Sequence, residues 1–194
     1  EPIRNRDHID HVQIDVPETL SLEQRIGFYE STGAYRDMVV THLFQVLAFM
    51  AMEPPTALEP RAISEEKNKV FRSMMTIEPR DVVRGQYQGY RNEPGVSPES
   101  DTETFIALRC RIDNWRWAGV PFYLRTGKRM AEGPRIISIA FREPPKSMFP
   151  ANSGVGAQGP DHLTFDLADA SKLSLSFYGK RPGPGMKLDK LSLQ

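Results

Sequence analysis

One very apolar stretch that ends in two prolines constrains the fold of this chain more than any other feature. Residues 34–52 repeat apolar side chains at helical spacing, and Pro54 and Pro55 then prevent the helix from continuing. A helix of this length spans roughly 28 Å at about 1.5 Å per residue. Because its apolar face is broad, we expect this helix to be buried against another layer of the protein.

Segments with strand periodicity lie on both sides of this helix. Residues 11–18 alternate apolar and polar side chains, which is the period of a strand with one buried face. Beyond the prolines, Ser64 can cap a second helix that we expect to run to about Met75. The chain then changes to a series of predicted strands at 82–90, 104–112, 120–126, 135–141, 162–168 and 172–178.

Two helices followed by a run of strands predict an α+β fold, with a large, mostly antiparallel β-sheet and helices on one face. The 194 residues are 39% hydrophobic, which is enough for one domain with a real core. Neither end of the sequence resembles a natural terminus, and the last residues resemble an interrupted strand. We therefore expect a fragment of a longer protein.

The bulk composition argues against several classes of function. Acidic and basic residues number 25 each, and this formal net charge of zero weighs against a nucleic-acid partner. The longest apolar run, residues 46–52, is far shorter than the roughly 20 residues of a membrane span. The single cysteine, Cys110, allows no internal disulfide, and no signal peptide is visible. These features predict a soluble protein of a reducing compartment such as the cytoplasm.

Residues 154–159, GVGAQG, match the G-x-G-x-x-G pattern of a dinucleotide-binding turn. Such a turn leaves a strand and opens a helix, whose N-terminus holds the pyrophosphate. Here the glycines run into Pro160 and Asp161 and then into a predicted strand. We interpret the segment as a surface loop between two strands.

Other candidate groups are weak when they are taken one by one. His8 and His11 have metal-ligand spacing, but in a strand residues three apart point to opposite faces, so we expect no metal site. His162 begins a predicted strand and has no obvious partner. Cys110 lies in a predicted strand without a neighbouring histidine, which favours a core residue over a nucleophile.

For two groups of residues, both a structural and a functional interpretation remain when the residues alone are considered. His42 lies on the apolar helix, where a hydrogen-bonded core histidine is the favoured interpretation. Asp37, five residues earlier, lies about 140° away around an α-helix, so the two could line a cavity only from different sides. Arg125, Lys128 and Arg129 surround a strand end and could clamp a phosphate, although a solvated basic turn is favoured.

Taken together, these stretches resemble the glucose-6-phosphate dehydrogenase family over essentially the whole chain. The most specific are RDMVVTHLFQVLAFMAMEPP (36–55) and VPFYLRTGK (120–128), and NRDHIDHVQIDVPE, DVVRGQY and RPGPGM fall in the family order. The match is to the C-terminal α+β domain of the family. The N-terminal Rossmann domain, with its RIDHYLGKE motif, is not in these residues.

The resemblance implies an enzyme that oxidises glucose 6-phosphate to 6-phosphoglucono-lactone with NADP, in the pentose phosphate pathway. His42 matches the general base that removes the C1 hydroxyl proton, a role suited to an imidazole with an ordinary pKa of about 6.5. Glu18 and Asp37 match carboxylates that hydrogen-bond the sugar hydroxyls, and Lys128 matches a lysine that contacts the sugar phosphate. The resemblance further implies that the missing domain holds most of NADP, and that the sheet forms a homodimer or homotetramer.

Some positions depart from the family pattern. Thr41 stands where asparagine commonly precedes the base, and Gln24 and Ile26 replace glycines. A second basic residue of the family falls on Gly133, with Arg135 nearby, so that contact is not assigned.

These residues alone are expected to be inactive, because the nucleotide-binding domain is missing. A non-catalytic sheet domain that serves subunit assembly is the main alternative, and a generic sugar-phosphate-binding module is a weaker one. The presence of all four site residues together favours the enzyme.

Overall fold

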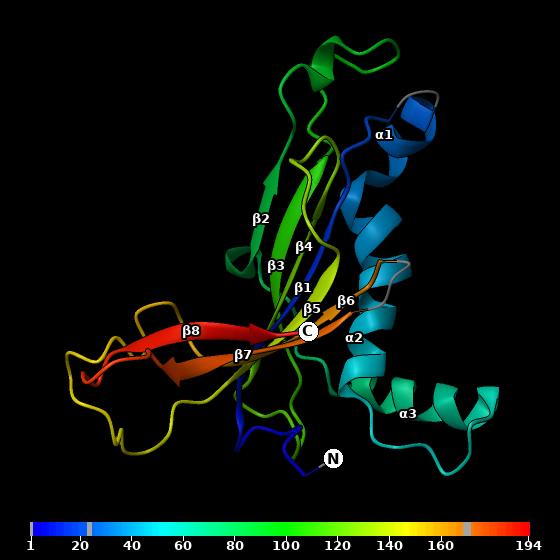
Figure 1. The fold of residues 1–194 in the computed structure, drawn as a ribbon. Coiled ribbons are helices and arrows are strands. Elements are labelled where there is room, and N and C mark those ends of the chain that lie inside the picture. The colour runs from blue at the N-terminus through cyan, green and yellow to red at the C-terminus, as the bar shows by residue number, and fades with distance from the viewer. Residues whose placement is uncertain (1, 23–24, 169–171) are drawn as a thin grey trace.

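The protein is built on a twisted eight-stranded β-sheet with helices on one face (Figure 1). The computed structural model describes residues 2–22, 25–168 and 172–194. The sheet order is β2-β3-β4-β1-β5-β6-β7-β8, in which β1 and β4 are parallel and the other described neighbours are antiparallel. The predicted α+β fold is therefore confirmed. The strands are β1 (Ile9–Pro17), β2 (Val82–Gly85), β3 (Phe105–Arg111), β4 (Pro121–Gly127), β5 (Ile136–Phe141), β6 (His162–Asp166), β7 (Leu173–Lys180) and β8 (Leu188–Leu193).

A long helical run lies along one face of the sheet and consists of three consecutive segments (Figure 1). These are α1 (Ile26–Ala34), the π-helix η2 (Tyr35–Leu43) and α2 (Phe44–Ala51). The helix α3 (Pro60–Ser73) packs against α2, and two short 3₁₀ helices, η3 (Pro79–Asp81) and η4 (Tyr90–Asn92), flank β2. None of the described helices is long and apolar enough to cross a membrane.

The hydrophobic core fills the space between this helical run and the central strands. Every second residue of β1 and β4 faces the helices, as the period of a strand requires. Trp117 closes the core at one end, where its indole Nε1 donates a hydrogen bond to the carbonyl of Ala51 at 2.8 Å. The fully buried members include Val12, Ile14, Val39, Leu43, Leu47, Trp117, Phe122 and Leu124.

The helix predictions are right in part. Residues 34–52 are helical almost throughout, and the helix ends before the prolines as expected. The sequence did not predict α1, because Gly27 and Gly33 are poor helix formers. The next helix starts at Pro60 rather than at Ser64, which lies inside it. Proline fits the first helical position, where its missing N–H is not needed.

All the predicted strands exist, with different ends. The strand predicted at 82–90 ends at Gly85. The backbone N–H of Tyr87 then donates to Thr104 Oγ1, and Gly89 adopts a φ of 85° that turns the chain into η4. β7 runs past its predicted end to Lys180, and the interrupted strand expected at the end of the chain is β8.

Residues 154–159 form a loop between β5 and β6, as predicted. Gly154, Gly156 and Gly159 all have positive φ, which lets the backbone fold into consecutive tight turns. The hydroxyl of Tyr178 on β7 donates to the carbonyl of Gly159 at 2.9 Å and fastens the loop to the sheet. The element that follows is a strand and not a helix, so the loop lacks the geometry of a dinucleotide cradle.

The helices cover only part of the sheet. Strands β7 and β8 turn across the direction of β2–β4 and extend away from the helical run (Figure 1). Their helix-side face is apolar and open: Leu175 is 38% exposed and Leu193 is 60% exposed. An apolar groove of about 790 Å³, lined by residues such as Phe49, Ile139 and Leu163, lies between α2 and strands β5 and β6.

Candidate active site

The parallel pairing of β1 with β4 brings two of the four predicted site residues together. In this pair both strands end at the same edge of the sheet, and Pro17 pairs with Gly127 in the register. Glu18 and Lys128 directly follow these residues. The backbone N–H of Glu18 donates to the carbonyl of Gly127 at 3.0 Å, and Lys128 Nζ lies 2.6 Å from Glu18 Oε2. The two side chains therefore form an ion pair although they are far apart in the sequence.

Lys128 is buried, so the favoured interpretation of a solvated basic turn is wrong for this residue. Its side chain is 9% exposed, and a buried ammonium requires a charged or polar partner. The other two cations of the turn point elsewhere. Arg125 Nη2 lies 2.7 Å from Asp15 Oδ2, and the guanidinium of Arg129 lies 5.2 Å from the ring centre of Tyr87. A clamp of three cations is not formed.

Asp37 joins this ion pair from the helical run. Lys128 Nζ lies 3.9 Å from Asp37 Oδ2, and Arg25 Nη2 lies 3.5 Å from Asp37 Oδ1. The side chains of Asp37 and Glu18 are 12% and 21% exposed. The result is a charged cluster of Glu18, Asp37 and Lys128, in which two carboxylates share one buried ammonium. Such a cluster can accept hydrogen bonds from hydroxyl groups and donate to an anion.

His42 lies on the same π-helix as Asp37. The N–H of Phe44 donates to the carbonyl of Val39, five residues earlier, which is the hydrogen bond that defines a π-helix. Residues five apart are therefore close in this helix form, and the separation of 140° expected from α-helical geometry is wrong. π-Helices are rare and occur often at functional sites.

The side chain of His42 is open to solvent. It is exposed, so the interpretation as a core histidine is wrong. Within the part of the chain that the structure describes, this imidazole has no hydrogen-bond or ion-pair partner. The structure thus gathers Glu18, Asp37 and Lys128 in one cluster. His42 lies five residues after Asp37 in the π-helix, which is the spacing of its backbone hydrogen bonds.

Tyr29 lies beside the charged cluster, and sequence reasoning missed it. Its side chain is 1% exposed, and its Oη has no hydrogen-bond partner among the described residues. Burial, followed by the nearby carboxylates of Asp37 and Glu103, raises the pKa of this phenol. The group therefore stays protonated and is an unused hydrogen-bond donor next to Asp37. The sequence offers one weak signal for Tyr29, which is its position directly before Glu30 in a helix of mixed polarity. That pattern does not distinguish a core tyrosine from a site residue.

The remaining candidates lie outside the cluster. Cys110 is buried in β3, as predicted, and burial raises the pKa of its thiol to about 12, so a reactive thiolate is not available. His11 Nδ1 lies 2.7 Å from Asp10 Oδ2, and His162 Nδ1 lies 3.2 Å from the carbonyl of Pro160. Among the described residues, no group of three or more histidine, cysteine or acidic side chains is placed to hold a metal ion.

The positions that depart from the family pattern have different surroundings. The hydroxyl of Thr41 donates to the backbone carbonyl of Asp37 within the π-helix. Ile26 is buried at the start of α1, and Gln24 lies outside the described residues. Arg135 is exposed, and its side chain has no ion pair within the described part of the chain.

These features define a class of protein: an α+β sheet domain with a charged cluster where a parallel strand pair meets a π-helix. Residues 1–194 match the family model described as glucose-6-phosphate dehydrogenase, C-terminal domain. The chain belongs to this family.

Its relatives are longer proteins. The chain is 44% identical to glucose-6-phosphate 1-dehydrogenase of Rhizobium meliloti, in an alignment that covers 100% of this chain and 42% of the relative. The crystal structure of the Mycobacterium avium enzyme of the same name superposes with a TM-score of 0.89 at 36% identity, over 99% of this chain and 42% of that one. A glucose-6-phosphate dehydrogenase in complex with its substrate glucose-6-phosphate gives a TM-score of 0.87 at 30% identity, over 99% of this chain and 40% of that one. The chain thus spans about two fifths of the length of these relatives.

Proposed function

We propose that this chain is the C-terminal, substrate-binding domain of a glucose-6-phosphate 1-dehydrogenase, which oxidises glucose 6-phosphate to 6-phosphoglucono-lactone with NADP. The observation that carries the proposal is the charged cluster of Glu18, Asp37 and Lys128 beside the π-helix that bears His42. A structural relative of the same fold is described in complex with glucose 6-phosphate, which supports this choice of substrate. In the cell, the reaction would belong to the oxidative part of glucose metabolism.

Each member of the site has a role in this proposal. The carboxylates of Glu18 and Asp37 accept hydrogen bonds from sugar hydroxyls, and the ammonium of Lys128 donates to the phosphate. The imidazole of His42, which is exposed, takes the proton of the C1 hydroxyl. The C1–H bond breaks at the same time, and its electron pair leaves with the hydrogen as hydride, which NADP would accept when it is bound. The carbonyl of the lactone forms from the C1 oxygen.

NADP is proposed to be bound by an N-terminal domain of the longer chain. The glycine-rich loop at 154–159 does not fit a dinucleotide, because it leads into β6 and not into a helix. The contribution of this domain is therefore to bind the sugar phosphate, orient C1 and remove a proton. A polypeptide of only these 194 residues would not catalyse the reaction.

The test uses the full-length protein that carries this domain. With glucose 6-phosphate and NADP, the wild type should produce NADPH, followed by its ultraviolet absorbance. His42→Asn should lower kcat by about 10²–10⁴-fold with a smaller change in KM, as the loss of a general base predicts. Lys128→Ala should mainly raise KM for the sugar phosphate.

The matched control is His162→Asn, because this histidine lies on β6 and touches no member of the cluster. Its kinetic constants should equal those of the wild type. Absence of NADPH production by a folded, full-length wild type would overturn the proposed function. It would favour the alternative of a non-catalytic domain that serves subunit assembly.

Self-association through the sheet, as a homodimer or homotetramer, is a further part of the proposal. The open apolar side chains of β7 and β8, among them Leu175 and Leu193, support it because large exposed apolar surfaces mark contact sites. A balanced charge and a single buried cysteine support a cytoplasmic protein without a nucleic-acid or membrane partner. Sedimentation equilibrium of the full-length protein tests the assembly, and a monomer would contradict it.

A further inference from the structure

The helical run that carries the site is interrupted at Gly33. This residue has φ 64° and ψ 175°, a conformation that is essentially restricted to glycine, and it kinks α1 two residues before the π-helix η2 begins. A Cβ atom at Gly33 would lie 2.6 Å from Glu103 Oε1. The side chain of Glu103 therefore occupies the space that the missing Cβ leaves open.

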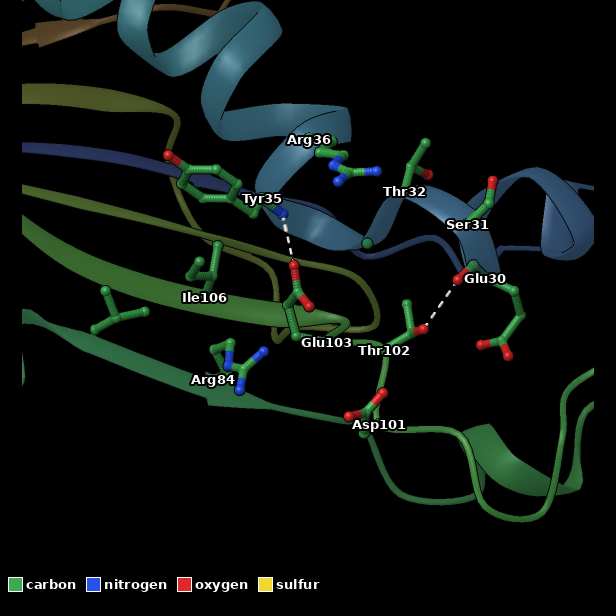
Figure 2. A pocket seen from close by; sticks show the side chains of 12 residues that line it. Glu30, Ser31, Thr32, Tyr35, Arg36, Arg84, Asp101, Thr102, Glu103 and Ile106 are labelled. Atoms are coloured by element: carbon green, nitrogen blue, oxygen red, sulfur yellow. Dashed lines mark hydrogen bonds between the residues drawn. The ribbon is translucent and has the colours of Figure 1, made fainter. Parts of the chain in front are cut away.

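Glu103 accepts hydrogen bonds from the backbone N–H groups of the last residue of α1 and the first residue of η2. Its Oε1 accepts a hydrogen bond from the N–H of Tyr35 at 2.9 Å (Figure 2). Its backbone carbonyl accepts one from the N–H of Ala34 at 2.9 Å. The first turn of a helix has N–H groups without partners inside the helix. A carboxylate at this end also interacts favourably with the helix dipole. Glu103 thus fixes where η2 begins, although it belongs to the segment before β3.

The two neighbours of Glu103 hold other parts of the site. Thr102 Oγ1 donates to the carbonyl of Glu30 in α1 at 3.0 Å (Figure 2). The carbonyl of Thr104, which is fully buried, accepts the backbone N–H of Lys128 at 2.8 Å. Residues 102–104 therefore contact the helix before the break, the helix after it and the lysine of the charged cluster. One short segment connects the helix side of the site with its strand side.

We propose that Glu103 is a positioning residue, which sets the place of Asp37 and His42 relative to Lys128 by binding the N–H of Tyr35. The proposal rests on the proposed function and deepens it. Glu103 touches no substrate in this account and acts only through the start of η2. It lines a polar pocket of about 390 Å³ together with Arg36, Arg84 and Asp101 (Figure 2).

The test compares Glu103→Ala with Glu103→Gln in the full-length enzyme. Alanine removes the acceptor, so η2 can shift and kcat/KM for glucose 6-phosphate should fall by about tenfold or more, since misplacement of catalytic groups by about 1 Å can cost 10²-fold. Glutamine keeps an oxygen that can accept the N–H of Tyr35, so it should restore kcat/KM to within about threefold of the wild type. Most of the loss should appear in kcat, because the base is displaced more than the phosphate contact.

Two control variants separate positioning from other effects. Asp101→Ala removes a carboxylate from the same pocket that makes no hydrogen bond or ion pair within the described residues, and it should leave kcat/KM unchanged. Asn114→Ala removes the acceptor of another backbone N–H, that of Trp117 at 2.9 Å, in a loop away from the site. It should lower thermal stability by an amount similar to Glu103→Ala without lowering kcat/KM.

Hydrogen exchange gives a readout that does not depend on activity. Peptides that cover residues 34–43 should exchange faster in Glu103→Ala than in the wild type, and Glu103→Gln and Asn114→Ala should not show this. Unchanged exchange in η2, or a kcat/KM of Glu103→Ala equal to that of the wild type, would overturn the inference. If Glu103→Ala does not fold, Glu103→Gln provides the test. A folded Glu103→Gln whose kcat/KM falls by about tenfold or more, the loss expected for alanine, would also overturn the inference. An inactive wild type with normal exchange would instead contradict the proposed function.

Discussion

Asp81 shows how one buried residue can set the acid sensitivity of the protein. Its side chain is fully buried, and Arg109 and Arg111 on β3 form ion pairs with it. The hydrogen bond from Arg109 holds the pKa of this carboxyl below its ordinary value of about 3.8. Because the pKa is lowered in the folded state, the charged form stabilises the fold above about pH 3.8. This contribution is lost as the pH falls through the pKa of the folded state.

We therefore expect Asp81→Asn to lower the urea midpoint at neutral pH. The difference from the wild type should shrink as the pH falls from about 3.8 through the lower pKa of the folded state, since the carboxyl of Asp81 then becomes protonated in the wild type as well. Urea denaturation at a series of pH values measures this. Asp7→Asn, at an aspartate that is 76% exposed, is the control and should change little at any pH. A difference that stays constant down to the lowest pH would contradict the role of the charge.

Single residues also mark how far the site could be predicted from the sequence. Resemblance singled out Glu18, Asp37, His42 and Lys128 as a group. Glu18, Asp37 and Lys128 meet in the structure, and the roles of all four residues stay a prediction. The burial of Lys128 could not be predicted, because its partner Glu18 arrives through a strand pairing that no local pattern encodes. Tyr29 was missed for a similar reason, since only the folded chain brings its hydroxyl near Asp37.

At the level of elements, α1 contains two glycines, Gly27 and Gly33, whose backbone conformations differ. Gly33→Ala should destabilise the protein by about 1–3 kcal/mol, because its conformation is nearly glycine-specific and the new Cβ would clash with Glu103. Gly27→Ala is the matched control in the same helix. It has nothing within 4 Å of the added Cβ and no positive φ, so it should be neutral or stabilising by up to about 1 kcal/mol.

Chemical denaturation of the wild type and the two variants measures both effects. A destabilisation of Gly27→Ala as large as that of Gly33→Ala would contradict the explanation by backbone conformation. A second comparison, Gly33→Ala combined with Glu103→Ala, should show less than the sum of the two single losses, because the clash is then removed.

The helical elements also explain why apolar periodicity did not predict the π-helix or the start of α3. Apolar spacing predicted the run at 34–52 well, because a broad apolar face looks the same in an α-helix and in a helix with a π segment. The hydrogen-bond register of η2 is set by contacts such as those of Glu103, which lies far away in the sequence. Proline at the start of α3 was a local signal that could have corrected the boundary placed at Ser64.

Across the whole molecule, stability should be highest at the centre of the sheet and lowest at its edges. β4 lies between β3 and β1, and its side chains Phe122 and Leu124 are at most 1% exposed. β8 is an edge strand with Leu193 60% exposed and no helix over it. Core strands exchange their amides near the global unfolding free energy, whereas exposed edges open locally.

Hydrogen-exchange mass spectrometry of this 194-residue chain should therefore show slow exchange in β1 and β4 and fast exchange in β8. β2, the opposite edge strand, is the internal comparison and should also exchange faster than β4. Equal protection of β8 and β4 would show that the open apolar face is covered in solution, for example by a second copy of the chain.

The parallel pair at the centre of this sheet has a consequence for the order in which the protein forms. The whole helical run, α3, β2 and β3 lie in the sequence between β1 and β4. Closing so long a connection costs chain entropy before any contact compensates for it, and such long-range pairings fold slowly. The helices can form within microseconds, but Glu18 meets Lys128 only when β1 has docked. During refolding, the ion pair of Glu18 with Lys128 should therefore form only in the slowest sheet-forming phase, after the helices are already intact.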